Sequence, residues 1–356
     1  MDITVTDGSA SNIQAAESQV RASGGGKVII PAGTYNLNGS VEIGTNVSLV
    51  GAGRGLTILN TQGENMLIKV VGTGVKVSGI SLVSSTWDGF AGIHVESYDF
   101  RIHDCDIEGY GYAGILVDHA INRGLIDNCF FKSRVITGLG YGVAVIRSNQ
   151  YDPNPSFGTK DCVFIEDCDF EGARHAISAS QGAKYVARHN YMHNCVVGQP
   201  IDAHGKVDDA QGTSSFEIYN NLIEMPGGGN MGIGIRGGSG VIFNNIVNSY
   251  QYGVILMVES DQVGMPYPVE GQIHNTYIWG NIFNTIKGGV VVASTPDSSD
   301  YVQLNREYFL ASKPGYTPYP YPHPMRDEVS HTSTMVTIAS SFVLMLTILY
   351  TRKKHR

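Results

Sequence analysis

The chain repeats one pattern of apolar and polar positions seven times. In each copy two apolar residues alternate along a short segment, a Cys or Asn follows, and another apolar residue comes two positions later. The Cys and Asn positions are Cys105, Cys129, Cys168, Asn190, Asn221, Asn245 and Asn281. Alternation with period two is typical of half-buried strands, and recurrence at intervals of 22 to 39 residues is typical of stacked coils. The pattern therefore predicts an all-β parallel solenoid.

Equal positions of successive coils lie one above another in a solenoid, about 4.8 Å apart. We therefore expect the seven Cys and Asn residues to form one vertical column. Stacked Asn amides donate and accept along such a column, which satisfies polar groups that would each cost about 1–3 kcal/mol if buried alone. Cys fills the same small inward corner as a modest apolar residue.

The repeat predicts one elongated domain with additions at both ends. Residues 1–45 are expected to cap the first coil with a short helix that starts after Ser11 and buries Ile13, Ala16 and Val20. Residues 46–300 are expected to form the β-helix itself. Residues 301–333 are rich in Pro and Tyr and are predicted to form a strap along the coils followed by a stalk.

The C-terminal residues predict a membrane anchor. Residues 335–350 contain no charged side chain, and the basic sequence RKKHR follows two positions later. We expect residues 334–351 to form a transmembrane helix and residues 352–356 to stay in the cytoplasm, which places the β-helix at the cell surface. The first residues, MDITVTDG, show no signal-peptide pattern. Either the start is truncated or export uses another route, and otherwise the segment would be a tail anchor with the β-helix inside the cell.

Charge and cysteine content exclude few classes of function. The chain has 24 basic and 32 acidic residues and a formal charge of −8, with no basic stripe, which argues against a nucleic-acid partner. An acidic polysaccharide would have to be bound by local basic residues. The spacing of the five Cys implies no pairing, and we expect five free thiols.

A second alternating strand allows the coils to be aligned around a possible site. We take the inward pairs to be Ile93/Val95, Ile115/Val117, Val143/Val145, Ile177/Ala179, Ile201/Ala203 and Ile233/Ile235. Their polar neighbours then point outward. On this register five side chains fall on adjacent coils of one face and form the candidate catalytic set: Tyr141, His175, Asp202, His204 and Arg236. Four acidic residues are candidates for substrate binding: Glu96, Asp118, Asp208 and Asp209.

These residue types suit the cleavage of a uronate polymer by β-elimination. That reaction needs a cation for the carboxylate, a base for the C5 proton and an acid for the leaving oxygen. Arg236 is the candidate cation, His204 or His175 the base and Tyr141 the acid, while Asp202 would orient His204. Hydrolysis is the alternative, and it needs two carboxyl groups, which Asp202 together with Asp118, Asp208 or Asp209 would supply.

Two segments resemble a known superfamily. The sequence GGGKVIIPAGTY followed by NVSLVGAGRGLTIL resembles the N-terminal region of the pectate-lyase-like superfamily, whose members are right-handed parallel β-helices. IDAHG is similar to the Asp-Pro-His segment of mannuronan epimerases, with Ala203 in place of proline and Gly205 in place of the second aspartate. The resemblance also admits Ca²⁺ as a cofactor, although no ligand set in the sequence demands one.

The sequence therefore predicts a surface-exposed β-helix that acts on polysaccharide, as a lyase or related enzyme of uronate-containing glycans. Two other classes stay open at this point. One is a non-catalytic protein that binds glycans or mediates adhesion. The other is a stiff structural spacer displayed from the membrane.

Overall fold

The computed structural model describes residues 1–61, 67–87, 89–135, 138–195 and 197–327. The chain divides into two compact units, residues 1–323 and residues 324–356. In the second unit the described residues include one 3₁₀ turn, η2 (Pro324–Arg326). The predicted transmembrane segment 334–351 and the basic tail 352–356 lie outside the described residues. Among the residues that are described, no helix is long and apolar enough to cross a membrane.

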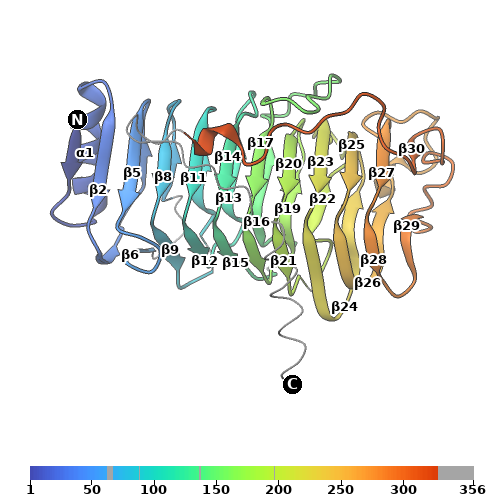
Figure 1. Cartoon of the computed structure of the whole chain (residues 1–356), viewed down its shortest axis with the longest axis horizontal. Coiled ribbons are helices and arrows are strands. Elements are labelled where there is room, and N and C mark those ends of the chain that lie inside the picture. The colour runs from blue at the N-terminus through green and yellow to red at the C-terminus, as the bar shows by residue number, and fades with distance from the viewer. Residues whose placement is uncertain (62–66, 88, 136–137, 196, 328–356) are drawn as a thin grey trace, which may run out of the picture. The chain divides into compact units, whose positions relative to one another are not determined.

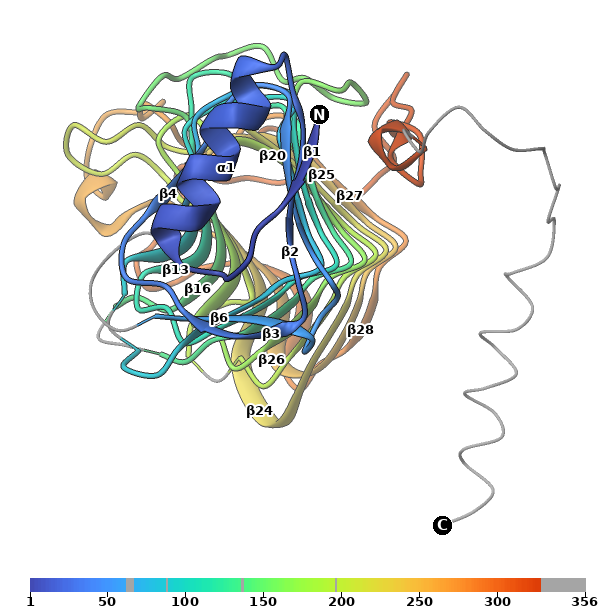
Figure 2. The ribbon, with the colours of Figure 1, turned by 90° about the vertical axis from the view of Figure 1, so that its left-hand side faces the viewer.

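The first unit is a stack of coils with parallel strands, as the repeat predicted (Figure 1). Viewed along the stack, the strands form three walls around one core (Figure 2). Wall 1 consists of β1 (Asp2–Thr4), β2 (Gly26–Ile30), β5 (Val47–Gly51), β8 (Lys76–Ser78), β11 (Phe100–His103), β14 (Gly124–Asp127), β17 (Val163–Glu166), β20 (Lys184–Arg188), β23 (Ser215–Tyr219), β25 (Ser239–Phe243), β27 (Thr276–Trp279) and β30 (Tyr308–Phe309).

The other two walls are joined by two long strands that run through both of them, β24 (Leu222–Ile235) and β26 (Ile246–Leu256). Wall 2 also contains β3 (Gly33–Asn36), β6 (Thr57–Thr61), β9 (Ser81–Ser84), β12 (Asp106–Glu108), β15 (Phe130–Lys132), β18 (Asp169–Glu171), β21 (Tyr191–His193) and β28 (Ile282–Asn284). Wall 3 also contains β4 (Val41–Ile43), β7 (Ile68–Val70), β10 (Ala91–Val95), β13 (Ala113–Asp118), β16 (Tyr141–Ile146), β19 (His175–Ala179), β22 (Ile201–Ala203) and β29 (Gly288–Val292).

The predicted column lies at the corner between walls 1 and 2. Asn190 donates from Nδ2 to Asn221 Oδ1 at 3.0 Å, Asn221 to Asn245 at 2.9 Å, and Asn245 to Asn281 at 2.9 Å. Each of these Oδ1 atoms also accepts from the backbone N–H of the residue one coil earlier in the column. The column is therefore a continuous hydrogen-bonded ladder through the C-terminal coils.

The residue before each column position makes the corner. All seven have a left-handed backbone with φ between 51° and 64°: Asp104, Asn128, Asp167, His189, Asn220, Asn244 and Gly280. Asn and Asp tolerate this conformation better than other non-glycine residues, which explains their recurrence at this point. The five cysteines are free and buried, as expected.

The N-terminal helix differs slightly from its prediction. Helix α1 (Ala10–Ala22) buries Ile13, Ala16 and Val20 against the first coil, as predicted. The predicted cap, Ser11, is wrong. Ser9 has the extended backbone of a cap, and its side chain accepts a hydrogen bond from the backbone N–H of Asn12, so the helix begins two residues earlier.

Residues 310–323, which we call the strap, run back over the outer face of wall 1. The Tyr316 hydroxyl donates to Glu217 on β23. Arg188 on β20 is fully buried and donates to the carbonyl oxygens of Tyr319 at 2.7 Å and Pro320 at 2.8 Å. Arg188 also donates to Glu166 on β17 at 2.6 Å. The strap therefore supplies two of the hydrogen-bond acceptors of the buried Arg188 guanidinium.

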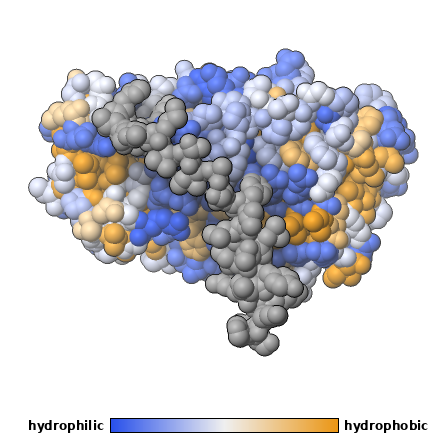
Figure 3. Space-filling view, viewed as in Figure 1, coloured by the Kyte–Doolittle hydropathy of each residue, from blue (hydrophilic) through white to orange (hydrophobic). Residues whose placement is uncertain are grey.

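The surface over these elements is mixed. On the face of Figure 1, hydrophilic side chains separate several apolar patches over the described residues (Figure 3). Two of the exposed apolar residues, Ile246 and Ile282, pair with each other on wall 2.

The Asn ladder should contribute more to the free energy of unfolding than a surface amide does. Asn221→Ala removes the acceptor of the Asn190 N–H and Nδ2–H groups and leaves them buried without it. We expect a loss of about 3 kcal/mol in the free energy of unfolding by urea. Asn248→Ala, which removes an amide on the outer face bonded to Glu224, should change it little. Equal losses from both variants would contradict the ladder's role.

Arg188 should hold the strap in place. Arg188→Met removes the cation from buried Glu166 and the donors to two strap carbonyls. We expect the unfolding free energy to fall by about 3–5 kcal/mol and chymotrypsin to cut faster after Tyr316. Lys132→Met, which breaks an exposed ion pair with Glu108, is the matched control and should change neither. Unchanged cleavage in Arg188→Met would show that the strap is held elsewhere.

Candidate functional site

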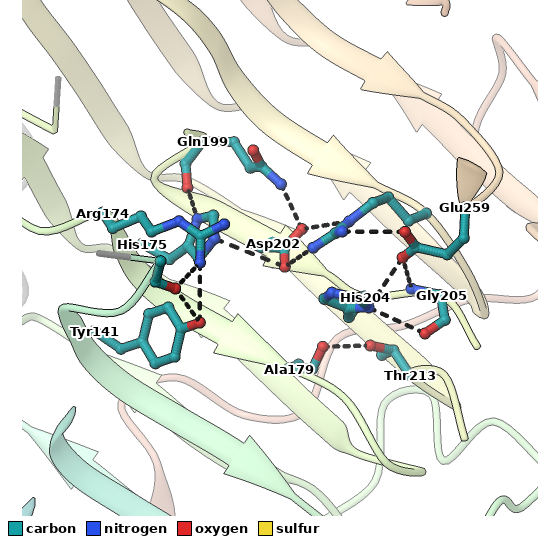
Figure 4. Close-up of polar contacts among 12 residues, drawn as sticks. Tyr141, Arg174, His175, Ala179, Gln199, Asp202, His204, Gly205, Thr213 and Glu259 are labelled. Carbon is teal, nitrogen blue, oxygen red and sulfur yellow. Dashed lines mark hydrogen bonds and ion pairs between the residues drawn. The ribbon is translucent and has the colours of Figure 1, made fainter. Parts of the chain in front are cut away.

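The predicted outward face exists and lies on wall 3. Tyr141 pairs with His175, Ser178 with Asp202, and Asp202 with Gly234, so the predicted register is confirmed. His204 follows β22 directly and Arg236 follows β24, and the Arg236 N–H bonds to the carbonyl of Ala203. The five candidate catalytic residues therefore come from consecutive coils. Polar contacts link Asp202 to His175 and, through Arg236 and Glu259, to His204 (Figure 4). Tyr141 lies beside this network and bonds to Arg174.

Asp202 is the buried anion at the centre of this network. Its side chain is fully buried and accepts from Arg236 Nε at 3.1 Å and from Arg236 Nη2 at 2.6 Å. The amide of Gln199 donates to the same carboxylate. Burial alone would raise the pKa of Asp202, but Arg236, followed by His175 and His204, lowers it to about 2. Asp202 is therefore ionised at every physiological pH and closed to solvent.

Arg236 bridges two carboxylates. Besides Asp202, it donates from Nη1 to Glu259 Oε2 at 3.2 Å. Glu259 follows β26, one coil beyond Arg236, and its side chain is 10% exposed. Burial would raise the pKa of Glu259, but the hydrogen bond from His204 and the charge of Arg236 lower it. The guanidinium predicted to bind a substrate carboxylate is thus engaged by two carboxylates of the protein.

His204 is more exposed than Asp202, Arg236 and Glu259. Its Nδ1 lies 2.9 Å from Glu259 Oε1 and 3.1 Å from the carbonyl oxygen of Gly205. Both partners accept, so Nδ1 carries the proton, and Nε2 is the basic nitrogen of the neutral ring. Burial would lower the pKa of His204, yet the hydrogen bond to Glu259, together with the charges of Asp202 and Glu259, raises it above its ordinary value. With 32% of its side chain exposed, His204 can be reached by a substrate.

His175 is placed differently from its prediction as a base. It is 2% exposed, and its Nδ1 donates to the carbonyl oxygen of Gln199 at 2.6 Å. Its Nε2 lies 4.0 Å from Asp202 Oδ2, and burial lowers its pKa. His175 therefore belongs to the buried support of the site.

Tyr141 lies over His175 and keeps its proton. The two rings stack with their centroids 5.4 Å apart. The Tyr141 hydroxyl donates to the carbonyl oxygen of Gly138 at 3.2 Å and accepts from Arg174 Nη1 at 3.1 Å. Partial burial raises the pKa of Tyr141, although Arg174 acts in the opposite direction. The phenol is therefore a proton donor at neutral pH.

The four predicted substrate-binding carboxylates lie apart from this network. Asp118 is on β13, three strand spacings or about 14 Å from the strand of Asp202, and it accepts from Ser148. Glu96 follows β10, one coil further away, and approaches His94. Asp208 and Asp209 lie in a tight turn closed by Val207 and Ala210. In the described part of the chain, none of the four forms a hydrogen bond or ion pair with Asp202 or His204.

Sequence reasoning missed Glu259 and Arg174. Glu259 comes three residues after Leu256, and Val254 and Leu256 continue the inward pairs by one coil. Extending the alignment by that coil would have brought Glu259 close to Arg236. Arg174 directly precedes His175, but nothing in the sequence distinguishes it from a solvated residue.

The donor set does not fit a resident Ca²⁺ ion. Ca²⁺ requires six to eight oxygen ligands, chiefly from free carboxylates. Asp202 and Glu259 are both committed to Arg236. Over the described parts of the chain, no three acidic, His or Cys side chains are placed to hold a metal ion.

Three comparisons relate the chain to known proteins. The model of the family described as rhamnogalacturonase A/epimerase, pectate lyase-like, matches residues 4–204. The structure is similar to alginate lyase from Paenibacillus sp. str. FPU-7, with 13% identity, a TM-score of 0.54, and coverage of 81% of this chain and 97% of that one. No curated protein matches the sequence significantly.

Two phage tailspikes have the same fold and are longer. The Dettilon tailspike protein has 13% identity and a TM-score of 0.59, with coverage of 82% of this chain and 57% of that one. A tailspike of E. coli bacteriophage HK620, solved with a pentasaccharide, has 15% identity and a TM-score of 0.52, with coverage of 80% and 55%. These similarities show the fold, which is consistent with the predicted right-handed β-helix. The family match covers more than half of the sequence, and the chain belongs to the rhamnogalacturonase A/epimerase, pectate-lyase-like family.

Proposed function

We propose that the chain is a polysaccharide lyase that removes the C5 proton of a uronate residue within an acidic glycan. The observation that carries this proposal is the pair formed by His204 and Glu259. Glu259 holds the proton on Nδ1 and leaves the basic Nε2 on an exposed ring. A histidine oriented by a carboxylate in this way is a common general base.

The proposed reaction uses three side chains. His204 Nε2 takes the C5 proton, the electron pair forms the C4–C5 double bond, and the C4–O4 bond breaks. Tyr141 donates its phenolic proton to the leaving oxygen. Arg174 is the proposed partner of the substrate carboxylate, because Arg236 is occupied by Asp202 and Glu259. Asp202 and Arg236 then serve to position Glu259 and, through it, His204.

The charge state of the site disfavours hydrolysis. A glycoside hydrolase needs one carboxyl group that stays protonated as the acid and a second one within about 5–9.5 Å. The two carboxyl groups of the network, Asp202 and Glu259, both have lowered pKa values. Asp118 lies about 14 Å away along the coils. Proton abstraction by His204 suits these groups better.

Non-catalytic glycan binding is the second candidate. One observation favours it: Asp202 and Arg236 neutralise each other and are largely buried, which would also suit a purely structural cluster. Under that alternative, polymer would bind without being cleaved, and substitution of His204 would leave the binding unchanged.

Turnover should depend on His204. Wild-type protein incubated with pectate, alginate or glycosaminoglycan should release unsaturated uronate, followed by its ultraviolet absorbance. His204→Gln should lower kcat about 10²- to 10⁴-fold, and Tyr141→Phe should lower it by a similar factor. Asp118→Asn is the control on the same wall and should keep full activity. If the wild type binds these polymers and releases no unsaturated product, the lyase proposal is wrong and non-catalytic glycan binding is supported.

The pH profile should report His204 and Tyr141. Protonated His204 cannot accept a proton, so kcat/KM should fall as the pH drops through its pKa, which lies above the ordinary 6.5. Glu259→Gln removes the group that raises this pKa, so the acidic limb should move to lower pH. The alkaline limb should follow Tyr141, whose pKa lies above 10, and disappear in Tyr141→Phe.

The histidine titration can be checked without turnover. NMR titration of the His204 ring should give a lower pKa in Glu259→Gln than in the wild type. Asp209→Asn, an exposed carboxylate outside the network, should leave this pKa unchanged. An acidic limb that stays in place while the NMR pKa of His204 falls would remove His204 as the base.

A further inference from the structure

A row of aromatic rings leads along wall 3 into the candidate site. The rings of Phe90 and Tyr112 are parallel, with centroids 4.7 Å apart. Tyr112 meets the ring of Tyr141 edge-on at 5.4 Å, and Tyr141 stacks on His175. Backbone hydrogen bonds from Tyr112 and Ala113 to the carbonyl of Phe90 place these rings on successive coils. The row therefore runs along the stack and ends at the polar network.

The floor beneath this row is apolar although it lies outside the core. Ala91, Ala113, Leu116 and Ala144 form a buried cluster that is separate from the main core, with Tyr112 and Tyr141 packed against it. Phe90, at the open end, is still 40% exposed. The cluster itself is closed to solvent, so the rings of Phe90, Tyr112 and Tyr141 are what this face presents to a ligand.

Cationic side chains flank the aromatic row. The guanidinium of Arg134 lies 4.7 Å from the ring centroid of Trp87, and Arg174 bonds to the hydroxyl of Tyr141. Trp87 lies three residues before Phe90 and has a left-handed backbone with φ of 60°, which is unfavourable for a bulky residue. Aromatic faces beside guanidinium groups match a ligand that has both an apolar face and negative charge.

We propose that this surface, which we call the aromatic subsite, binds consecutive residues of the acidic glycan whose reacting linkage lies at His204. This inference rests on the proposed function. A pyranose ring presents a face of C–H groups that can cover Phe90 and Tyr112, and its carboxylate can pair with Arg134. Tyr112 adjoins β13, three strand spacings or about 14 Å from β22, a span that several linked sugars cover. The protein therefore selects a long acidic chain and binds it over the aromatic row.

A single tryptophan can report this binding. The chain has two tryptophans, and the second, Trp279, lies on wall 1 and stacks on Phe243. Trp279→Phe leaves Trp87, beside the aromatic subsite, as the only indole. Adding hexagalacturonate or hexamannuronate to this variant should give a saturable change in fluorescence. The corresponding dimers and neutral maltohexaose should bind far more weakly.

Substitutions in the aromatic subsite should weaken that binding selectively. In the Trp279→Phe background, Phe90→Ala, Tyr112→Ala and Arg134→Gln should each raise the Kd for the acidic hexamer about tenfold. Ile282→Ala, an exposed apolar residue on wall 2, is the matched control and should not change it. Phe90→Ala removes a ring that is already partly exposed, so its melting temperature should match that of its parent, which keeps the test valid if Tyr112→Ala folds poorly.

The outcomes separate this inference from the lyase proposal. His204→Gln should abolish cleavage and keep the Trp87 response. A Trp87 response in a protein that cleaves no polymer would support the aromatic subsite and contradict the lyase. The opposite result would be cleavage of an acidic polymer by the wild type without binding at the aromatic subsite. Trp87 would then not respond to either hexamer, or Phe90→Ala would bind as tightly as its parent. Either outcome would overturn the aromatic subsite and leave the lyase in place.

Discussion

The parallel register between successive coils is the constraint on which the rest of the structure depends. A shift of one residue would turn every inward side chain outward, so the register must be fixed in each coil. The Asn ladder fixes it at one corner, because each amide donates to its equivalent on the next coil and accepts from the backbone N–H of the preceding coil. Tyr141, His175 and Asp202 are neighbours only because this register holds.

The same register allows charge to be buried on wall 3. Removing Asp202 and Arg236 from water costs several kcal/mol for each ion, and their attraction offsets this only with good geometry and further hydrogen bonds. Two hydrogen bonds between them and a third partner, Glu259, supply that geometry. A buried cluster of this kind contributes little net stability, but it fixes the position of the Glu259 carboxylate. His204 therefore meets an acceptor that is already ordered, and its ring orientation is set before any substrate arrives.

Much of the fold could be predicted because its pattern repeats from coil to coil. The details of the site could not be predicted, because its side chains do not follow a repeat. Alternation and spacing were enough to align Ile177 with Ile201 and to bring Asp202 and Arg236 together. The partner of His204 was predicted to be Asp202, and it is Glu259. Glu259 lies beyond the strand end, beside η1 (Ser260–Gln262), where the chain leaves the repeat and no column assigns its direction. The helix cap was misplaced for a similar reason, since Ser9 and Ser11 are equivalent by residue type and differ only in backbone conformation.

Outward positions of a solenoid are where function can be recognised. Inward positions are set by the core, so Ile115 and Val143 say nothing about a ligand. Outward positions do not have to fill the core, and contact with water favours polar residues there. Phe90 gains no burial in the interior and exposes apolar surface to water. A single such residue would mean little, but Phe90 continues into Tyr112, Tyr141 and His175, with Arg174 bonded to the Tyr141 hydroxyl. Chance exposure would scatter aromatic rings over the three walls, whereas an extended polymer requires them in one row beside the site.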